Sequence, residues 1–128
     1  MRIDKDLVFF ITGGASGLGE ATVRLLHSLG CKIAIADWND ERLKLVADDL
    51  KERVITFKCD VTKEEDVKKA VEGTVAKFGT IHAALACAGV ATVTPTLTSA
   101  GGLNTDTFRK TMEINVNGSV YVAKYCSI

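Results

Sequence analysis

The sequence has no surplus of charge and no long apolar run. Its 128 residues contain sixteen Lys and Arg and sixteen Asp and Glu. With no net positive charge to attract phosphate backbones or anionic headgroups, we expect neither nucleic acid nor a membrane as a partner. The apolar runs fall short of the ~18 residues that span a bilayer, and the charged residues 1–6 precede a strand-like segment rather than a signal-peptide core. A soluble protein is therefore expected.

Closely spaced cysteine pairs are also missing. Cys31, Cys59, Cys87 and Cys126 lie far apart, and none forms the CxxC pair of a zinc site or a redox motif. We expect no metal site and interpret the four residues as reduced thiols in the core. Reduced thiols indicate a reducing compartment, the cytoplasm or the mitochondrial matrix.

Proline occurs only once, and the chain instead alternates regularly between strand-like and helix-like segments. Continuous apolar segments are typical of parallel strands that are covered on both faces. Residues 7–11 form such a segment, and the mostly apolar segments 32–36, 54–57 and 81–86 are predicted as the other strands. The alternation requires crossovers between parallel strands, which are nearly always right-handed. It predicts one α/β domain over residues 1–128, a Rossmann-like doubly wound parallel sheet that is truncated after the fourth strand and the following helix.

Local signals predict where the helices begin and end. The first helix ends at Gly30, a suitable C-terminal cap, and a later helix ends at Gly79. Thr62, with Glu65 three residues later, has the pattern of a capping box that opens this later helix. The apolar stripe of the first helix is predicted to be Leu18, Ala21, Leu25, Leu26 and Leu29.

The end of the sequence departs from the regular alternation. Residues 90–104 contain the proline and many Thr, Gly and Ser residues, which indicates a surface insertion before a helix that begins near residues 104–106. This last helix has one broad, largely apolar face, which we expect to pack against another surface. Strand 81–86 would be an open apolar edge of the sheet. Association through either surface is expected, and a homo-oligomer for the complete protein. The face comprises Phe108, Met112, Asn115, Val116, Ser119, Val120 and Ala123, with Gly118 beside it.

A glycine-rich turn separates the first strand from the first helix. Glycines let the backbone turn tightly and approach a pyrophosphate, which the amides and the dipole of the helix N-terminus attract. A bland tight turn is the alternative, but the strand before and the helix after favour the phosphate site. A nucleotide-hydrolysing P-loop would need Lys and then Ser or Thr after Gly19, but this chain has Glu20 and Ala21 there. Hydrolysis of ATP or GTP is therefore not expected. The predicted binding residues here are Gly13, Ser16, Gly17, Leu18 and Gly19.

Asp37 follows the second strand, about twenty residues after the glycines. A carboxylate at this position can accept hydrogen bonds from the ribose hydroxyls of an adenosine, and it would repel a 2′-phosphate. No Arg or Lys adjoins it, because Trp38 and Asn39 come next, and Glu20 adds negative charge nearby. NAD is therefore predicted rather than NADP. The alternative is that Asp37 is a solvated acid before a helix.

Two further turns complete the predicted site. Asp60 and Val61 follow the third strand, where a carboxylate and an amide could pair with the edge of adenine, although Asp60 could equally be a turn residue. Cys87, Ala88 and Gly89 follow the fourth strand and are small enough for backbone to pass beside a ribose, although any small-residue turn would look the same.

Together, the pattern TGxxxGxG, Asp37, Asp60-Val61, Ala88-Gly89 and Asn115 resembles the short-chain dehydrogenases/reductases over essentially the whole chain. Residues 11–19 and 87–91, with the insertion that follows, look like the subfamily of type 2 3-hydroxyacyl-CoA dehydrogenases, also called 17β-hydroxysteroid dehydrogenases of type 10. The resemblance implies that Ser16 and Leu18 contact the cofactor phosphates and their surroundings. It also implies that Asp37 contacts the adenosine ribose, Asp60 and Val61 the adenine, and Cys87 the neighbouring ribose through its backbone.

The resemblance also implies a catalytic set that is incomplete here. Asn115 matches the helix asparagine that holds a water near the catalytic lysine of the family. The family's serine, tyrosine and lysine belong to a fifth strand and its following helix, which the sequence does not contain. Tyr121, Lys124 and Tyr125 have the wrong spacing for Tyr-x-x-x-Lys and are interpreted as packing or surface groups. Ala86 also departs from the family, which usually has there an asparagine that ties neighbouring strands together.

The leading hypothesis is an NAD-dependent oxidoreductase that transfers a hydride between NAD and a secondary alcohol or ketone of a small-molecule substrate. The resemblance suggests a 3-hydroxyacyl-CoA or a hydroxysteroid as that substrate. This chain would be an N-terminal fragment of it, inactive alone. A second hypothesis is a non-catalytic NAD-binding or interaction module. A third is a methyltransferase that uses S-adenosylmethionine, which the helix-opening glycine motif and Asn115 disfavour.

Overall fold

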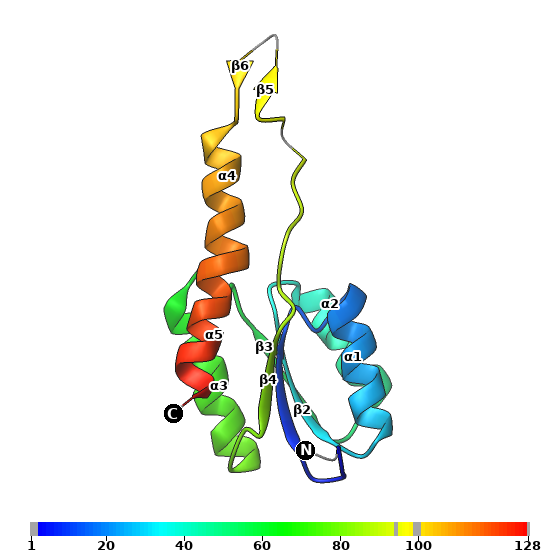
Figure 1. The fold of residues 1–128 in the computed structure, drawn as a ribbon. Coiled ribbons are helices and arrows are strands. Elements are labelled where there is room, and N and C mark those ends of the chain that lie inside the picture. Colours follow the sequence, from blue (N-terminus) through cyan, green and yellow to red (C-terminus); the bar gives the residue numbers. More distant parts are fainter. Residues whose placement is uncertain (1–2, 94, 99–100, 128) are drawn as a thin grey trace.

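A computed structural model describes residues 3–93, 95–98 and 101–127. Its centre is a parallel sheet with the strand order β3-β2-β1-β4 (Figure 1). The strands are β1 (Val8–Thr12), β2 (Lys32–Asp37), β3 (Val54–Lys58) and β4 (Ala83–Ala86). The predicted Rossmann-like sheet is therefore confirmed, with a fourth strand two residues shorter at its start than the apolar run suggests.

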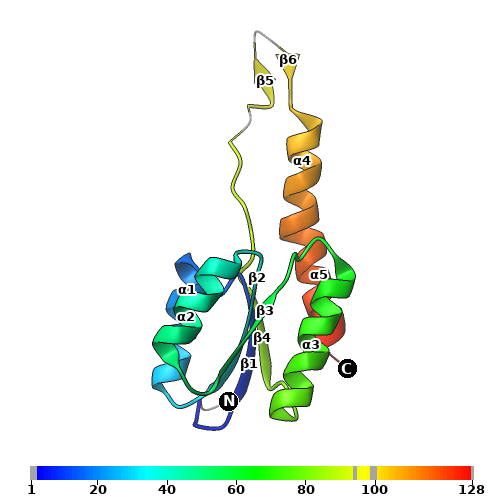
Figure 2. The same cartoon turned by 180° about the vertical axis from the view of Figure 1, so that it is seen from behind.

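Helices cover both faces of this sheet (Figures 1 and 2). On one face lie α1 (Gly17–Ser28) and α2 (Asp40–Leu50), and on the other lie α3 (Glu64–Phe78) and α5 (Gly118–Cys126). Successive residues of a strand point to opposite faces. Phe9 and Ile11 of β1 accordingly pack in the core beneath α1 and α2, whereas Phe10 belongs to the core beneath α3 and α5. Consecutive residues of this strand are thus apolar, because alternate side chains fill the cores on the two faces of the sheet.

The predicted apolar stripe of α1 is wrong in most of its members. Leu26 is buried, but Leu18 is 85% exposed and Leu25 is 61% exposed. The buried face consists of Gly19, Val23 and Leu26. A side chain at Gly19 would place its Cβ 2.1 Å from the carbonyl oxygen of Gly13, so the glycine-rich turn sets the rotation of the helix.

The predicted capping box of α3 is also wrong, whereas its end is confirmed. The helix begins at Glu64 after Lys63, with no side-chain cap. The Thr62 hydroxyl donates instead to Asp60 Oδ1 at 2.7 Å, so it is not available to the helix. Gly79 has the left-handed conformation of a C-terminal cap, with φ +86°.

The segment after β4 extends away from the sheet and returns as a long helix (Figure 1). It contains a short antiparallel pair, β5 (Leu97–Thr98) and β6 (Gly101–Gly102), and then α4 (Thr105–Met112). The predicted helix start is confirmed, because Asn104 Oδ1 accepts hydrogen bonds from the amides of Asp106 and Thr107. A π-helical turn, η1 (Glu113–Asn117), joins α4 to α5 without a break.

Gly118 allows this long helix to pack closely on the turn after β3. A Cβ there would lie 2.9 Å from Val61 Cγ2, so only glycine permits this approach. The face that was expected to pack against something remains exposed in the described part of the chain: Phe108 is 49% exposed and Val120 is 56% exposed. Strand β4 pairs with β1 alone among the described strands, so it is an edge, as predicted.

All four cysteines are free, but they are not all core residues. Cys31 and Cys59 are buried, Cys126 is partly buried and Cys87 is exposed, so the core interpretation is wrong for Cys87. Burial raises the pKa of the Cys59 thiol to about 12. Among the described residues, no group of three or more His, Cys, Asp or Glu side chains could hold a metal ion. None of the described helices is both long and apolar enough to cross a bilayer.

Candidate functional site

A cleft of about 880 Å³ lies where the carboxyl ends of all four parallel strands meet. In open parallel sheets this end is where ligands bind, between strands whose crossovers go in opposite directions. The structure brings to this cleft all of the predicted cofactor-binding residues, which come from four separate turns. They are Gly13, Ser16, Gly17, Leu18, Gly19, Asp37, Asp60, Val61, Cys87, Ala88 and Gly89.

The glycine-rich turn forms one wall of the cleft and needs glycine at two positions for different reasons. Gly13 has φ +67°, and a Cβ there would lie 2.6 Å from the amide nitrogen of Ala88, so the turn packs directly on the neighbouring wall. Gly17 has φ +54°, and a Cβ there would meet nothing within 4 Å. The side chain of Ser16, the N-cap of α1, makes no capping hydrogen bond. The backbone at the start of α1 therefore faces open space, as an anion-binding helix N-terminus requires.

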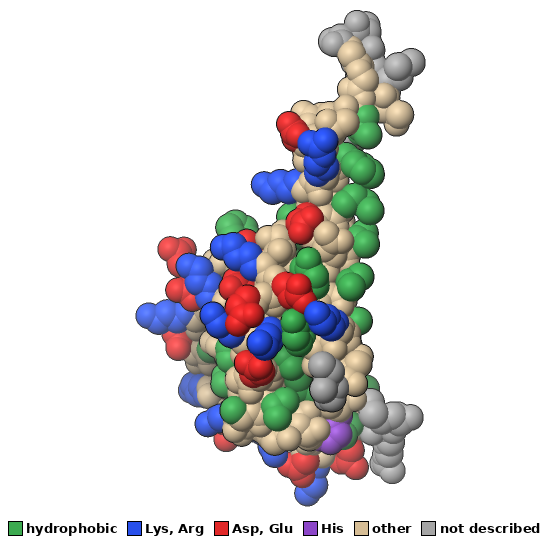
Figure 3. Space-filling model, turned by 90° about the vertical axis from the view of Figure 1, so that its left-hand side faces the viewer, with side chains coloured by type: hydrophobic (Ala, Val, Ile, Leu, Met, Phe, Trp, Pro, Cys, Tyr) green, Lys and Arg blue, Asp and Glu red, His purple; other side chains and the backbone are tan. Residues whose placement is uncertain are grey.

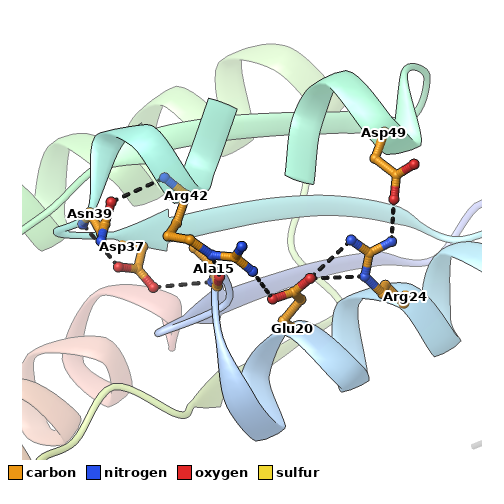
Figure 4. Close-up of polar contacts among 7 residues, drawn as sticks. All are labelled: Ala15, Glu20, Arg24, Asp37, Asn39, Arg42 and Asp49. Atoms are coloured by element: carbon orange, nitrogen blue, oxygen red, sulfur yellow. Dashed lines mark hydrogen bonds and ion pairs between the residues drawn. The ribbon is translucent and has the colours of Figure 1, made fainter. Parts of the chain in front are cut away.

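Asp37 connects the end of β2 to this turn (Figure 4). Its Oδ2 accepts a hydrogen bond from the Ala15 amide at 3.1 Å, and its Oδ1 accepts one from the Asn39 amide at 3.0 Å. The residue is only 6% exposed, so the alternative of a solvated acid is wrong. A carboxylate has about four acceptor positions. Two positions thus remain for donors from a ligand in the cleft.

Sequence reasoning missed an arginine beside this carboxylate (Figure 4). Arg42 Nε donates to the carbonyl oxygen of Ala15 at 3.1 Å, and its guanidinium forms an ion pair with Glu20. Glu20 also pairs with Arg24 at 2.9 Å, and Arg24 pairs with Asp49. The spacing of four residues could have revealed the pair of Glu20 and Arg24. The contact of Arg42 with Glu20 joins α2 to α1, 22 residues apart in the sequence, and leaves no local pattern.

Glu20 carries the negative charge expected of it, but this charge is paired with two arginines. Its side chain is 17% exposed and lies between two guanidinium groups. Burial raises the pKa of the Glu20 carboxyl, but hydrogen bonds from Arg24 and Arg42 outweigh this effect and hold the pKa below its usual value. Glu20 is thus charged, with its charge compensated.

The turn after β3 is organised by Asp60 itself. Asp60 Oδ1 accepts hydrogen bonds from the amide of Thr62 at 3.0 Å and from its hydroxyl at 2.7 Å. The hydroxyl bond lowers the pKa of Asp60. The interpretation of Asp60 as a turn residue is confirmed, and the same turn places it and Val61 on the cleft.

The turn after β4 is held by Asn115. The Asn115 amide group donates to the carbonyl oxygen of Val90, and its Oδ1 accepts from the Val90 amide, both at 2.8 Å. A Cβ at Gly89 would lie 3.3 Å from Asn115 Oδ1, so glycine allows this close approach. Asn115 itself is outside the lining of the cleft. It fixes the backbone that follows Cys87, Ala88 and Gly89.

The long helix supplies a further wall that sequence reasoning missed. Arg109, Lys110, Glu113 and Ile114, from α4 and η1, line the cleft. Nothing in the local sequence indicates that these helices return to this end of the sheet.

The two tyrosines of the chain lie away from the cleft. Tyr125 donates to Glu64 Oε1 at 2.9 Å, and Lys124 pairs with the same oxygen at 2.7 Å. The interpretation of these side chains as packing or surface groups is consistent with their contacts. The cleft has instead open backbone at a helix N-terminus and a buried acid, a combination that suits a dinucleotide. The residues present therefore fit such a cofactor.

Comparisons with known proteins agree with this geometry. The profile of a family described as short chain dehydrogenase matches residues 7–127. A 2,5-dichloro-2,5-cyclohexadiene-1,4-diol dehydrogenase of Sphingobium indicum is 38% identical over 115 residues, which are 90% of this chain and 45% of that protein. A 3-hydroxyacyl-CoA dehydrogenase type-2 of Drosophila melanogaster is 34% identical over 122 residues, 94% of this chain and 48% of that protein. The chain thus spans about half the length of these curated relatives.

Solved structures show the same arrangement of strands and helices. A short-chain type dehydrogenase/reductase from Mycobacterium ulcerans superposes with a TM-score of 0.89 and 26% identity, covering 97% of this chain and 46% of that one. A short-chain dehydrogenase/reductase from Brucella melitensis, titled glucose/ribitol dehydrogenase, has a TM-score of 0.88 and 28% identity, covering 99% of this chain and 53% of that one. The likeness extends over all the elements that surround the cleft.

Proposed function

Because this chain belongs to the short-chain dehydrogenase family, we propose that its cleft binds NAD and that the complete protein transfers a hydride between NAD and a secondary alcohol or ketone. The observation that carries the proposal is the buried carboxylate of Asp37 at the end of β2, next to the open backbone of the glycine-rich turn. NAD, when bound, supplies the hydride chemistry. The residues of this chain bind and orient it.

Each wall of the cleft has a separate task in this proposal. The start of α1, with Ser16, Gly17 and Leu18, receives the pyrophosphate. Asp37 accepts hydrogen bonds from the hydroxyls of the adenosine ribose, and Asp60 and Val61 face the adenine. Backbone beside Cys87 and Gly89 passes close to the next ribose, and Asn115 holds that backbone in place.

The preference for NAD over NADP follows from charge in this proposal. A 2′-phosphate would be placed against the carboxylate of Asp37 in a poorly solvated position, where like charges repel strongly. Arg42, the arginine that contacts the same turn in the described part of the chain, is already paired with Glu20. Both features favour a ribose with a free hydroxyl.

The proton chemistry and the substrate pocket are proposed to reside outside the 128 residues. Neither tyrosine of the chain lines the cleft, and the relatives are about twice as long. We propose that a serine, a tyrosine and a lysine elsewhere in the complete protein polarise the substrate oxygen and move the proton. The names of the relatives favour a secondary alcohol, and the resemblance to the type 2 3-hydroxyacyl-CoA dehydrogenases adds acyl-CoA thioesters and hydroxysteroids to the substrates worth testing.

A non-catalytic NAD-binding module is the second candidate, favoured by the same absence of a tyrosine on the cleft.

Calorimetry with the purified protein tests the proposal. We expect weak but saturable binding of NAD and no binding of S-adenosylmethionine. Asp37→Ala should weaken NAD binding at least about tenfold, because the loss of a charge-assisted hydrogen bond costs roughly 1.5–3 kcal/mol. Asp40→Ala removes an equal charge three residues away, outside the lining of the cleft, and should leave binding unchanged.

Four results would contradict the proposal or divide its candidates. Tight binding of S-adenosylmethionine alone would overturn it. Equal effects of Asp37→Ala and Asp40→Ala would remove the assigned role of Asp37. Hydride transfer by the 128-residue chain at family-like rates would show that the proton chemistry is wrongly placed outside it, and NAD binding without turnover by the full-length protein would favour the non-catalytic module.

A further inference from the structure

The residues around Ala15 place a second charged group next to the proposed ribose site. The Ala15 amide donates to Asp37, and the Ala15 carbonyl accepts from Arg42. The guanidinium of Arg42 and the carboxylate of Asp37 are therefore held by the two ends of a single residue of the glycine-rich turn (Figure 4). The Arg42 side chain is 41% exposed, so a ligand outside the ion pair can reach it.

The two arginines that pair with Glu20 differ in whether they have a second carboxylate partner. Of the two arginines that pair with Glu20, Arg24 has a second carboxylate partner, Asp49. The described part of the chain offers Arg42 no carboxylate partner other than Glu20. Loss of the Glu20 charge would thus leave Arg24 paired, whereas Arg42 would retain only the carbonyl oxygen of Ala15.

We propose that Glu20 is a second determinant of cofactor specificity, which acts by withholding Arg42 from a phosphate on the adenosine ribose. A guanidinium is suited to bind phosphate through two parallel hydrogen bonds. Arg42 has the required chemistry and contacts Ala15, the residue whose amide holds Asp37, but its guanidinium is paired with Glu20 rather than turned to the lining of the cleft. The inference rests on the proposed binding of NAD in this cleft and adds Glu20 to Asp37 as a residue that disfavours NADP.

The test is calorimetry with NAD and NADP on matched variants. Glu20→Gln keeps the shape of the side chain and removes its charge, and we expect NADP to bind roughly three- to tenfold more tightly while NAD changes less than about twofold. The double variant Glu20→Gln with Arg42→Met should lose this gain. Arg24→Met removes the other arginine and leaves the pair of Glu20 and Arg42 intact, so its ratio of the two affinities should equal that of the unaltered protein.

Each outcome bears on a distinct part of the inference. No gain for NADP in Glu20→Gln overturns it, and a gain that persists in the double variant shows that loss of negative charge alone is responsible and overturns the role of Arg42. Circular dichroism melting checks that the variants fold, and Glu20→Ala offers a second way to remove the carboxylate. If the unaltered protein binds neither dinucleotide, the proposed function fails and the inference with it. If it binds NAD and Glu20→Gln gains nothing, only the inference fails.

Discussion

Thr12, the last residue of β1, carries a polar group that its surroundings do not satisfy. The residue is 1% exposed, and its hydroxyl is buried without a hydrogen-bond partner in the described part of the chain. It pairs in register with Ala86 of β4, where the resembling family usually has an asparagine. An asparagine at position 86 could have offered the hydroxyl a partner across the two strands. Thr12 therefore has an unpaired buried hydroxyl next to the glycine-rich turn.

Thr12→Val should stabilise the protein. Valine has nearly the same shape and no hydroxyl, so the substitution removes the desolvation cost of an unpaired group, about 1 kcal/mol of unfolding free energy. Thr74→Val is the matched control, because Thr74 is equally buried but its hydroxyl donates to the Ala70 carbonyl at 2.7 Å. Urea denaturation should show a gain for Thr12→Val and none for Thr74→Val. A loss of stability for Thr12→Val would mean that its hydroxyl has a partner in solution.

Residues of the candidate site could be predicted where a local motif fixes their place. The glycines, Asp37 and Asp60 each directly follow a strand, and the carboxyl ends of parallel strands meet at one edge. Arg42 could not be predicted in this way, because its contact with Glu20 joins positions 22 residues apart on two helices. Such a contact depends on how the two helices are rotated, which no short pattern records.

The π-helical turn η1 is the element that connects the cleft to the long helix. It contains Asn115, whose two hydrogen bonds hold the backbone of Val90. Insertions of this kind often occur at functional sites. The turn also affects the exposed apolar face. On an ordinary α-helix, side chains spaced four residues apart move about 40° around the axis at each step. The wider π-helical turn reduces this rotation, so side chains with that spacing stay closer to one side of the helix.

Asn115→Ala should loosen the wall of the cleft that follows β4. It removes two hydrogen bonds to Val90, and at about 1 kcal/mol each we expect the Val90 amide to exchange its hydrogen roughly tenfold faster or more. Asn117→Ala is the control from the same π turn, because Asn117 bonds only to Glu113 within the helix. Hydrogen exchange followed by NMR would measure both. Equal protection of Val90 in the parent protein and in Asn115→Ala would contradict the holding role of Asn115.

At the level of elements, the strands were easier to predict than the faces of the helices. An apolar run that fills two cores is an unambiguous signal, and all four predicted strands are present. The stripe of α1 was wrong because leucine is abundant on several sides of the helix, while the contact that decides its rotation involves Gly19, which has no side chain. The capping box failed for a related reason, since the Thr62 hydroxyl had a nearer acceptor in Asp60.

On the scale of the whole molecule, one surface exposes several large hydrophobic side chains next to one another. Hydrophobic side chains gather in a column along the long helix (Figure 3). Four of them, spaced four residues apart, are between 41% and 56% exposed: Phe108, Met112, Val116 and Val120. We call this column the apolar face. Contiguous apolar surface on a helix commonly marks a contact with another protein surface.

We propose that the protein associates with itself through the apolar face, and Val116→Glu tests this because the residue is in the middle of the column. A carboxylate there would have to be desolvated in the contact, so the substitution should shift sedimentation toward the monomer across a range of concentrations. Leu45→Glu is the control, since Leu45 is 58% exposed on α2, away from the column. If both variants sediment like the parent protein, the apolar face is not the contact. If Leu45→Glu has the same effect as Val116→Glu, added charge rather than the position of the face governs association, and open strand β4 becomes the surface to test.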